Sequence, residues 1–320
     1  MLNKRFHFAG LFAGLVMNHE AFAFSFRISN RPWTIFFVVT RKLLQLLRLA
    51  PREHGAVATR RKPDVPAEIA AVEWYHTIDL RNGVVTPGVF DHKPILHSYR
   101  LPDRMDGLRV LDVATWDGFW AFEFERRGAA EVVALDIGKR GDVDLTPAVR
   151  RRIVEEHGAN FLEEPTGKGF AIAHRQLRSS VTRRVLNIYD ISPETVGTFD
   201  VVHVGDVLLH LKYPHRALEN VRRVTTGYAI ISEPFVPELD TMGRDRLLRY
   251  LGGEQDTTWW AFSLDALKRM IIDAGFERLE LLNTFHFGGL YDHAIIHAFP
   301  KADREDRQVR PAIRQSHQNS

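Results

Sequence analysis

The chain has 320 residues, 45% of them hydrophobic and 26% charged, which is typical of a globular protein and enough for one large domain with extensions. It has no cysteine, which excludes disulfides, thiolate zinc sites and cysteine nucleophiles. The formal charge of +3 is unevenly divided: residues 1–65 carry +8 (11 basic, 3 acidic), residues 66–300 carry −7 (27 and 34) and residues 301–320 carry +2 (5 and 3). The body of the chain therefore lacks the overall positive charge of nucleic-acid-binding domains.

Residues 1–65 are a basic leader and linker, which we expect to be poorly ordered or helical. The first 24 residues have the outline of a secretory signal, but polar residues interrupt it and we favour a cytoplasmic protein. Leucines between Arg41 and Arg48 predict a short basic amphipathic helix, which could contact a membrane surface or a partner. The polar stretch 51–66 predicts a linker, and we place the domain boundary near it.

Residues 66–108 are predicted to form a cap ahead of the core domain. The Asn-Gly pair at 82–83 lies between two apolar runs, which is a strong signal for a hairpin turn. Trp74, Tyr75 and His76 form an aromatic and titratable cluster just before it. We expect this cluster to close over a site, although simple packing of the tryptophan would explain part of it.

Residues 109–120 give the strongest functional signal. An apolar strand ends in Asp112, a tight turn follows, and an apolar helix opens at Gly118. Strand, turn and helix in this order build a cofactor site at the carboxyl end of a parallel strand. A second apolar strand, 131–136, ends in Asp136, which is placed to bind the two ribose hydroxyls of an adenosine.

The rest of the pattern alternates strands with helices. Further strands are predicted at 185–188, 199–204, 228–232, 276–282 and 294–299, and helices at 147–156, 170–177, 214–224 and 264–274. The charged segment 240–255 predicts a helix inserted over the strand ends, and the polar residues 301–320 predict a disordered tail. The last two strands have no helix between them. The predicted fold class over 109–300 is therefore α/β, a doubly wound, seven-stranded Rossmann-like sheet with an antiparallel last hairpin.

These features are similar to those of a known family. The strand order, the cofactor turn, Asp136 and the final hairpin resemble the class I S-adenosylmethionine-dependent methyltransferases. More narrowly, segments 74–79, 115–120 and 205–211 are similar to one branch of that class. This branch includes the tRNA wobble-uridine (5-hydroxyuridine) methyltransferases and many relatives of unknown substrate. The resemblance covers about residues 68–300, with the methyltransferase domain following the cap.

The resemblance implies S-adenosylmethionine as cofactor and gives several residues a role in binding it. Asp112 would hold the cofactor's amino group or order the turn, and Asp136, with Ile137 beside it, would bind the ribose diol. Asp190 would accept from the adenine amino group with Tyr189 alongside, or would only cap a helix. The turn and the end of the fourth strand complete the set: Ala114, Thr115, Trp116, Gly118 and Gly205. The general class has glycine at two of these turn positions, where this chain has alanine and tryptophan, and we expect the alanine to cost some cofactor affinity.

Three residues are candidates for the general base that removes a proton from the acceptor. His210 follows the fourth strand, and an imidazole titrates near neutral pH, although this histidine could also only bond a neighbouring loop. Glu233, at the end of the fifth strand, faces the same cleft by topology, and His76 in the cap comes next. Three residues of the last hairpin are interpreted as structural: His286, Tyr291 and His293. The histidines show no ligand spacing, so we expect no metal site.

The expected function is S-adenosylmethionine-dependent O-methylation of a small molecule. A tRNA acceptor is possible but less favoured, because the body of the chain is acidic. The tRNA enzymes of the branch can use a carboxylated cofactor that a lysine of the cap grips. No lysine lies between Pro63 and Lys93, so we expect the plain cofactor. Two other classes stay open: a non-catalytic cofactor-binding module, and an NAD-dependent oxidoreductase, against which the missing Gly-x-Gly-x-x-Gly argues.

Overall fold

The computed structural model describes residues 2–8, 11–18, 21–28, 31–37 and 66–301, except for residues 82, 243–245, 254–256 and 288–290. The chain divides into two compact units, Met1–Arg61 and Lys62–Ser320, and the division falls within the predicted linker. The helix predicted between Arg41 and Arg48 and the predicted tail beyond Lys301 lie outside the described residues. None of the described helices is long and apolar enough to cross a bilayer.

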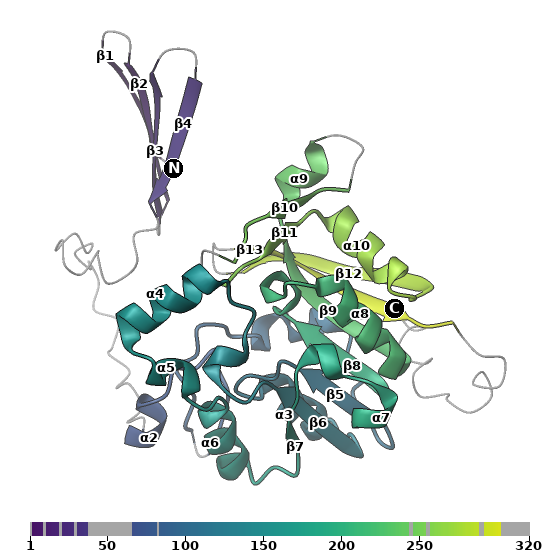
Figure 1. Ribbon diagram of the computed structural model, residues 1–320. Helices are drawn as coiled ribbons and strands as arrows, with labels where there is room; N and C mark the ends of the chain where they lie inside the picture. The colour runs from purple at the N-terminus through teal and green to yellow at the C-terminus, as the bar shows by residue number, and fades with distance from the viewer. Residues whose placement is uncertain are drawn as a thin grey trace. The chain divides into compact units, whose positions relative to one another are not determined.

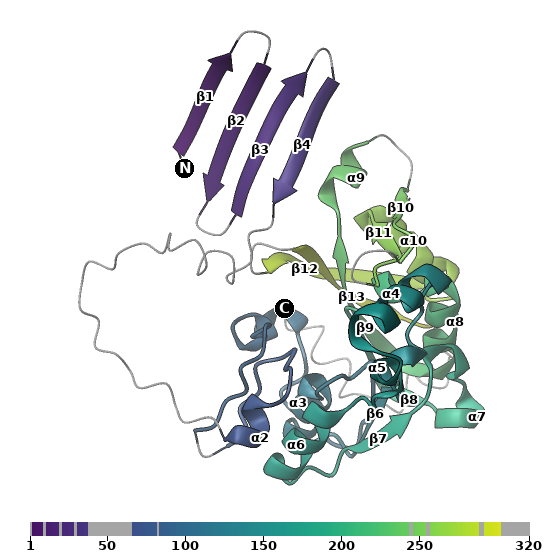
Figure 2. The ribbon, with the colours of Figure 1, turned by 60° about the vertical axis from the view of Figure 1, so that its left-hand side comes forward.

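The first unit contains a four-stranded antiparallel sheet in the order β1-β2-β3-β4 (Figure 2). Its strands are Leu2–Phe8, Leu11–Asn18, Ala21–Ile28 and Arg31–Phe37. The prediction of a poorly ordered or helical leader is wrong for these residues. Phe22, Phe24 and Phe26 alternate with alanine and serine, a period of two that is typical of strands. The prediction followed the overall hydrophobicity of the segment and overlooked this alternation.

The second unit is built on a seven-stranded sheet in the order β12-β13-β9-β8-β5-β6-β7 (Figure 1). Its strands are β5 (Arg109–Val113), β6 (Glu131–Asp136), β7 (Thr182–Val185), β8 (Phe199–Gly205), β9 (Thr225–Phe235), β12 (Arg278–Phe287) and β13 (Tyr291–Phe299). Strands β5 to β9 are parallel, whereas β13 is antiparallel to both β9 and β12. The predicted fold class is confirmed. The strand order reverses at β5, and such a switch point leaves a crevice at the carboxyl ends of the strands.

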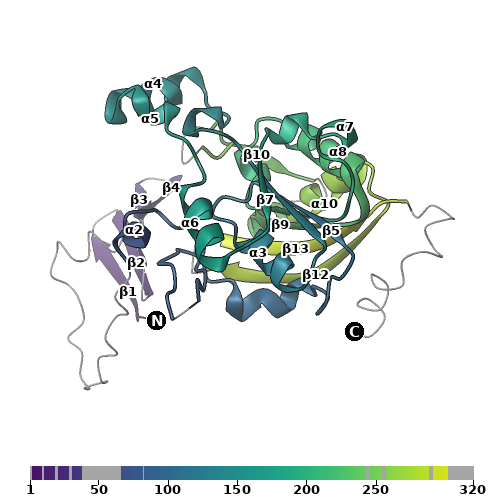
Figure 3. The ribbon, with the colours of Figure 1, turned by 90° about the horizontal axis from the view of Figure 1, so that it is seen from below.

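Helices cover both faces of this sheet (Figure 3). They are α3 (Phe119–Arg126), α6 (Lys168–Leu177), α7 (Pro193–Val196), α8 (Pro214–Val224) and α10 (Leu264–Asp273), with α4 (Pro147–His157) and α5 (Asn160–Glu163) following β6. Val196, Leu218 and Leu267 of α7, α8 and α10 share one buried cluster with the sheet, whereas Phe124 of α3 and Phe170 of α6 belong to another. Strand β8 is buried at six of its seven residues, including its two polar residues, Asp200 and His203.

The cap folds as part of the second unit. It contains α2 (Ala67–Ala70), the 3-10 helix η1 (Lys93–Tyr99) and two isolated bridges, one of which joins Asp79 to Val85 in antiparallel fashion. This bridge encloses the predicted hairpin turn, where Gly83 has a φ of +76°. Trp74 is 2% exposed, donates its indole N–H to the carbonyl of Ile69 at 2.8 Å, and packs in the same cluster as α3. The cap and the sheet therefore share one hydrophobic core.

Two predicted elements differ from the structure. The third strand was predicted at 185–188, but β7 ends at Val185 and Ile188 is buried in a 3-10 turn, η3 (Ile188–Asp190). Strand β7 lies at the edge of the sheet, so its residues are polar and do not give an apolar strand signal. The helix predicted at 240–255 does not extend over residues 240–242 and 246–253, the part of this range that the structure describes. Helix α9 (Pro237–Thr241) is short, β10 (Leu248–Tyr250) pairs with β11 (Trp260–Phe262), and a pair of glycines with positive φ follows β10.

Candidate active site

A cavity of about 430 Å³ lies at the carboxyl ends of β5, β6 and β8. This volume is within the range of small-molecule and cofactor sites. The cap contributes Tyr75 and His76 to the wall, and the segment after β8 contributes Asp206 and His210. The wall also includes most of the predicted cofactor residues: Asp112, Ala114, Thr115, Trp116, Asp136, Ile137, Tyr189 and Gly205. Three residues predicted for the site do not line the cavity: Gly118, Asp190 and Glu233.

The turn after β5 has a left-handed backbone at two non-glycine residues. Ala114 and Trp116 have φ angles of +59° and +52°, a region that side chains other than glycine seldom occupy. These are the positions where the resemblance expects glycine, so the chain keeps the glycine-type turn at a cost of about 1 kcal/mol or more at each residue. Gly118, with φ +91°, begins α3, and a Cβ there would lie 2.5 Å from the ring of Phe122 and 2.7 Å from that of Phe170.

Asp112 orders this turn. It is 1% exposed; its Oδ2 accepts a hydrogen bond from the Thr115 hydroxyl at 2.7 Å, and its Oδ1 lies 2.8 Å from Nδ1 of His203. His203 is the register partner of Asp112 on β8 and packs against the ring of Trp120, 4.5 Å between centroids. Its buried Nε2 faces no hydrogen-bond partner among the described residues, and the side chain lines the cavity. His203 was not identified from the sequence.

Asp136 fits the ribose of S-adenosylmethionine. It is 6% exposed, and its oxygens accept from the backbone N–H groups of Trp116 at 3.0 Å and Ile137 at 2.8 Å. Burial raises the pKa of Asp136 to about 6, although these two N–H groups and nearby Arg183 favour the charged form. An ionised carboxylate offers about four acceptor positions, so about two remain for a diol. A buried, ionised carboxylate is stabilised by each further hydrogen-bond donor, and the ribose hydroxyls would be such donors.

The two residues of η3 that were predicted to bind adenine separate in the structure. Tyr189 lines the cavity; its hydroxyl donates to Asp144 at 2.5 Å and accepts from the backbone N–H of Tyr213 at 3.0 Å. Asp190 is exposed and away from the cavity wall; its backbone N–H donates to the carbonyl of Asn187 at 2.9 Å, and its own carbonyl accepts from the hydroxyl of Thr195 at 3.0 Å. The helix cap proposed as the alternative role of Asp190 is made instead by Ser192.

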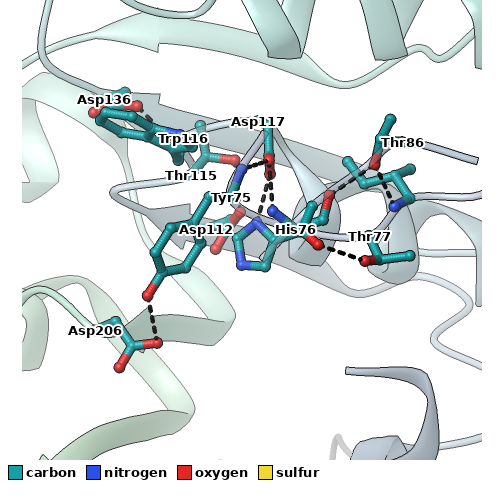
Figure 4. A network of polar contacts seen from close by, with 12 residues as sticks. Tyr75, His76, Thr77, Thr86, Asp112, Thr115, Trp116, Asp117, Asp136 and Asp206 are labelled. Atoms are coloured by element: carbon teal, nitrogen blue, oxygen red, sulfur yellow. Dashed lines mark hydrogen bonds and ion pairs between the residues drawn. The ribbon is translucent and has the colours of Figure 1, made fainter. Parts of the chain in front are cut away.

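Asp117 joins the end of the cofactor turn to the cap, as Figure 4 shows. Its Oδ2 accepts from the backbone N–H groups of Tyr75 at 2.9 Å and His76 at 2.8 Å, and its Oδ1 lies 2.5 Å from Nδ1 of His76. Both side chains are buried, with 1% of Asp117 and 7% of His76 exposed. Because Nδ1 is engaged, Nε2 is the ring nitrogen of His76 that is left to exchange a proton with a ligand. His76 was a sequence candidate, whereas Asp117, 41 residues further on, was not.

A second acid and histidine meet at the hydroxyl end of Tyr75. This hydroxyl donates to Oδ2 of Asp206 at 3.2 Å, and Oδ1 of Asp206 lies 2.6 Å from Nε2 of His293 on β13. Burial alone would raise the pKa of Asp206, but the hydrogen bond from His293 and the nearby histidines hold this pKa below its ordinary value. His293, interpreted from the sequence as structural, thus supports the cavity wall. Despite this gathering of acids and histidines, the described part of the chain contains no group of three or more that could hold a metal ion.

The other two candidates for the general base have different positions. His210, in the 3-10 turn η4 (Leu208–His210), lines the cavity, with its Nδ1 3.4 Å from the carbonyl oxygen and 3.3 Å from the hydroxyl of Thr257. Glu233 is fully buried, and its Oε1 accepts from the backbone N–H groups of Val207 and Leu208 at 2.9 and 3.0 Å. Burial raises the pKa of Glu233 to about 8, so it is mostly protonated at neutral pH. The structure corrects the topological prediction: Glu233 points beneath the segment after β8 and holds it.

Residues 93–281, more than half of the chain, match the family described as a methyltransferase domain. The chain belongs to this family. The predictions of enzyme class and of S-adenosylmethionine as cofactor are confirmed, and the oxidoreductase and non-catalytic alternatives are set aside. No curated protein sequence matches the methyltransferase.

Three solved structures are similar to the methyltransferase at low sequence identity. The N-terminal domain of EvdMO1, in the presence of SAH and D-fucose, is 14% identical over 71% of this chain and 91% of that one, with a TM-score of 0.47. A putative methyltransferase from Bacillus halodurans C-125 is 15% identical over 65% and 99%, with a TM-score of 0.43. Magnesium protoporphyrin IX methyltransferase from Synechocystis PCC 6803, with bound SAM, is 15% identical over 62% and 72%, with a TM-score of 0.38.

Proposed function

We propose that the methyltransferase methylates an oxygen atom of a small-molecule acceptor, with plain S-adenosylmethionine as the methyl donor. The observation that carries this proposal is the pairing of His76, which lines the cavity, with the buried Asp117 of the cofactor turn. An oxygen acceptor must lose a proton during methyl transfer, and this pair offers a nitrogen base beside the cofactor. The net charge of −7 over residues 66–300 favours a small molecule over the phosphate backbone of a tRNA.

The cofactor would be held by the turn after β5 and by the end of β6. Asp136 would accept from the ribose hydroxyls, while the N–H groups of Trp116 and Ile137 keep its carboxylate oriented. When bound, the cofactor would supply an electrophilic methyl group: the bond from this methyl to sulfur would break with its electron pair going to sulfur, while the acceptor oxygen would form the new bond and give up its proton. The protein must align the acceptor with the methyl group and remove the acceptor's proton.

His76 is the base that we favour. Asp117 binds its Nδ1–H, which fixes the tautomer with a basic Nε2 and would stabilise the imidazolium once the proton has arrived. His210 has weaker support, because its Nδ1 faces the carbonyl and hydroxyl oxygens of Thr257 at 3.4 and 3.3 Å, and these neutral oxygens would stabilise an imidazolium less than the carboxylate beside His76. Glu233 has no support as the base, because it is buried and does not line the cavity.

The acceptor class can be tested directly. The enzyme is incubated with methyl-labelled S-adenosylmethionine and either a panel of phenols, sugars and hydroxy acids or tRNA that carries 5-hydroxyuridine at the wobble position. Transfer of label to one or more small hydroxyl compounds is the expected result. Transfer to the tRNA alone would overturn the proposal and favour the wobble-uridine branch.

The base can be tested with His76→Asn, which keeps an N–H for Asp117 and removes Nε2. Turnover of the acceptor found in the panel should fall about 10²- to 10⁴-fold, with the dissociation constant of S-adenosylhomocysteine within about threefold of wild type. His286→Asn is the matched control, because this exposed histidine on β12 contacts Asp292 and not the cavity. Retained turnover in His76→Asn together with a defect in His210→Asn would transfer the role to His210.

A further inference from the structure

We propose that Asp206 is an acceptor-binding residue, and that the acceptor therefore presents a hydroxyl or ammonium donor rather than an anionic group to this part of the cavity. The proposal rests on the proposed function and adds the chemical class of the acceptor. No family pattern described above assigns a role to this carboxylate. It lines the cavity directly after β8, beside the turn that follows β5.

The exposure of Asp206 separates it from the two buried acids at the start and end of the turn after β5. Its side chain is 23% exposed, whereas those of Asp112 and Asp117 are each 1% exposed. Asp112 and Asp117 use their oxygens within the protein, to order the turn and to hold the cap. Asp206 is thus the acid of this group that a molecule in the cavity can reach.

The contacts of Asp206 fix its orientation and leave acceptor capacity. Tyr75 donates to one oxygen and His293 lies 2.6 Å from the other, so the carboxylate is held at both ends (Figure 4 shows the tyrosine contact). A carboxylate offers about four acceptor positions, so about two stay available to a ligand. A preoriented acceptor of this kind binds a donor without the entropy cost of ordering a flexible side chain.

The charge around Asp206 selects against anions. Its pKa is held below the ordinary value, so the group is ionised at neutral pH. Among the described residues that line the cavity, Arg140 is the one lysine or arginine, and its guanidinium pairs with Glu164 at 3.2 Å. Asp206 itself contacts a tyrosine hydroxyl and a histidine. A carboxylate or phosphate placed here would face an ionised acid, whereas a hydroxyl or ammonium would gain a charge-assisted hydrogen bond.

The backbone gives an independent indication. Asp206 has a φ of +49°, in the left-handed region where glycine carries no steric penalty. A non-glycine residue in this conformation has an energetic cost, and such residues concentrate at functional sites. Asp206 therefore occupies a backbone conformation in which glycine would be less strained.

The test compares two ligands that differ at the transferred methyl group. S-adenosylhomocysteine has a neutral sulfur there, and sinefungin has an amine-bearing carbon that is protonated at neutral pH. Calorimetry should show that wild type binds sinefungin at least tenfold more tightly than S-adenosylhomocysteine. Asp206→Asn should reduce this preference about tenfold to hundredfold while S-adenosylhomocysteine binding stays within about threefold of wild type, which also reports that the site is folded.

Two further variants control the interpretation. Asp142→Asn removes an equal charge from another part of the same cavity wall and should leave the preference unchanged. Tyr75→Phe removes a donor to Asp206 but keeps its charge, so the preference should persist. The proposal is overturned if Asp206→Asn keeps the wild-type preference, or if Asp142→Asn loses as much of it. Because neither ligand is an acceptor, this result and the outcome of the acceptor panel can fail separately.

Discussion

Asp136 allows the most quantitative test of the cofactor site. It is buried, accepts two backbone hydrogen bonds, and has a pKa raised to about 6 by burial. A diol donates best to the ionised form, so binding should be strongest above pH 6 and should weaken as the pH falls through this value. With a pKa near 6, the ionised fraction drops about tenfold between pH 7 and pH 5. The affinity of wild type for S-adenosylhomocysteine, measured by calorimetry, should therefore fall about tenfold over this range.

Asp136→Asn removes the charge and leaves one of the two backbone N–H groups without its acceptor. The lost charge-assisted hydrogen bonds are worth roughly 1.5–3 kcal/mol, so affinity at pH 7.5 should fall about tenfold to hundredfold and should no longer depend on pH between 5 and 7. Glu131→Gln, at the opposite end of β6 and paired with Arg109, is the control and should bind as wild type does. Equal wild-type affinity at pH 5 and pH 7, or an unimpaired Asp136→Asn, would refute the assignment.

Three further outcomes are expected. Because burial raises the pKa of Glu233 from 4.5 to about 8, wild-type stability should decline as the pH rises through this window, and Glu233→Gln should show a flatter melting profile between pH 5 and 8. The variant should keep its turnover, whereas lost turnover would mark Glu233 as catalytic. Gly118→Ala should lower the free energy of unfolding by about 2–4 kcal/mol in urea titrations. The control Gly107→Ala, at φ +75° in open space, should lose about 1 kcal/mol, and equal losses would contradict the packing argument. A chain starting at residue 63 should fold cooperatively and bind S-adenosylhomocysteine as the full chain does, and unfolding on truncation would show that residues 1–62 belong to the core.

The sequence predicted the central strands of the sheet most accurately. Strands β5 and β6 are buried on both faces, so they appear as apolar runs with a recognisable acid at or next to the end. At the edges this signal fails. Strand β7 is polar because it is exposed, and β10 and β11 are only three residues each, too short for a period to show.

The cavity residues that directly follow their strands were largely predictable. The acid–histidine pairs beside them were not, because each is a long-range contact. Asp117 meets His76 across 41 residues, Asp206 meets His293 across 87, and Asp112 meets His203 across 91. The prediction for Glu233 failed for a related reason. Topology places a residue at the end of a strand, but only the local pleat decides whether its side chain enters the cavity or turns away from it.

Asp117 couples the conformation of the cap to that of the cofactor turn. Its three hydrogen bonds to Tyr75 and His76 form only when the turn that precedes it is in place. A ligand that fixes the turn therefore also suppresses local opening of the cap, and linkage requires the reverse to hold by the same factor. Cofactor and acceptor should thus raise each other's affinity without any hinge between domains. Slowed hydrogen exchange at the amides of residues 75 and 76 would report this cooperativity on addition of the cofactor alone.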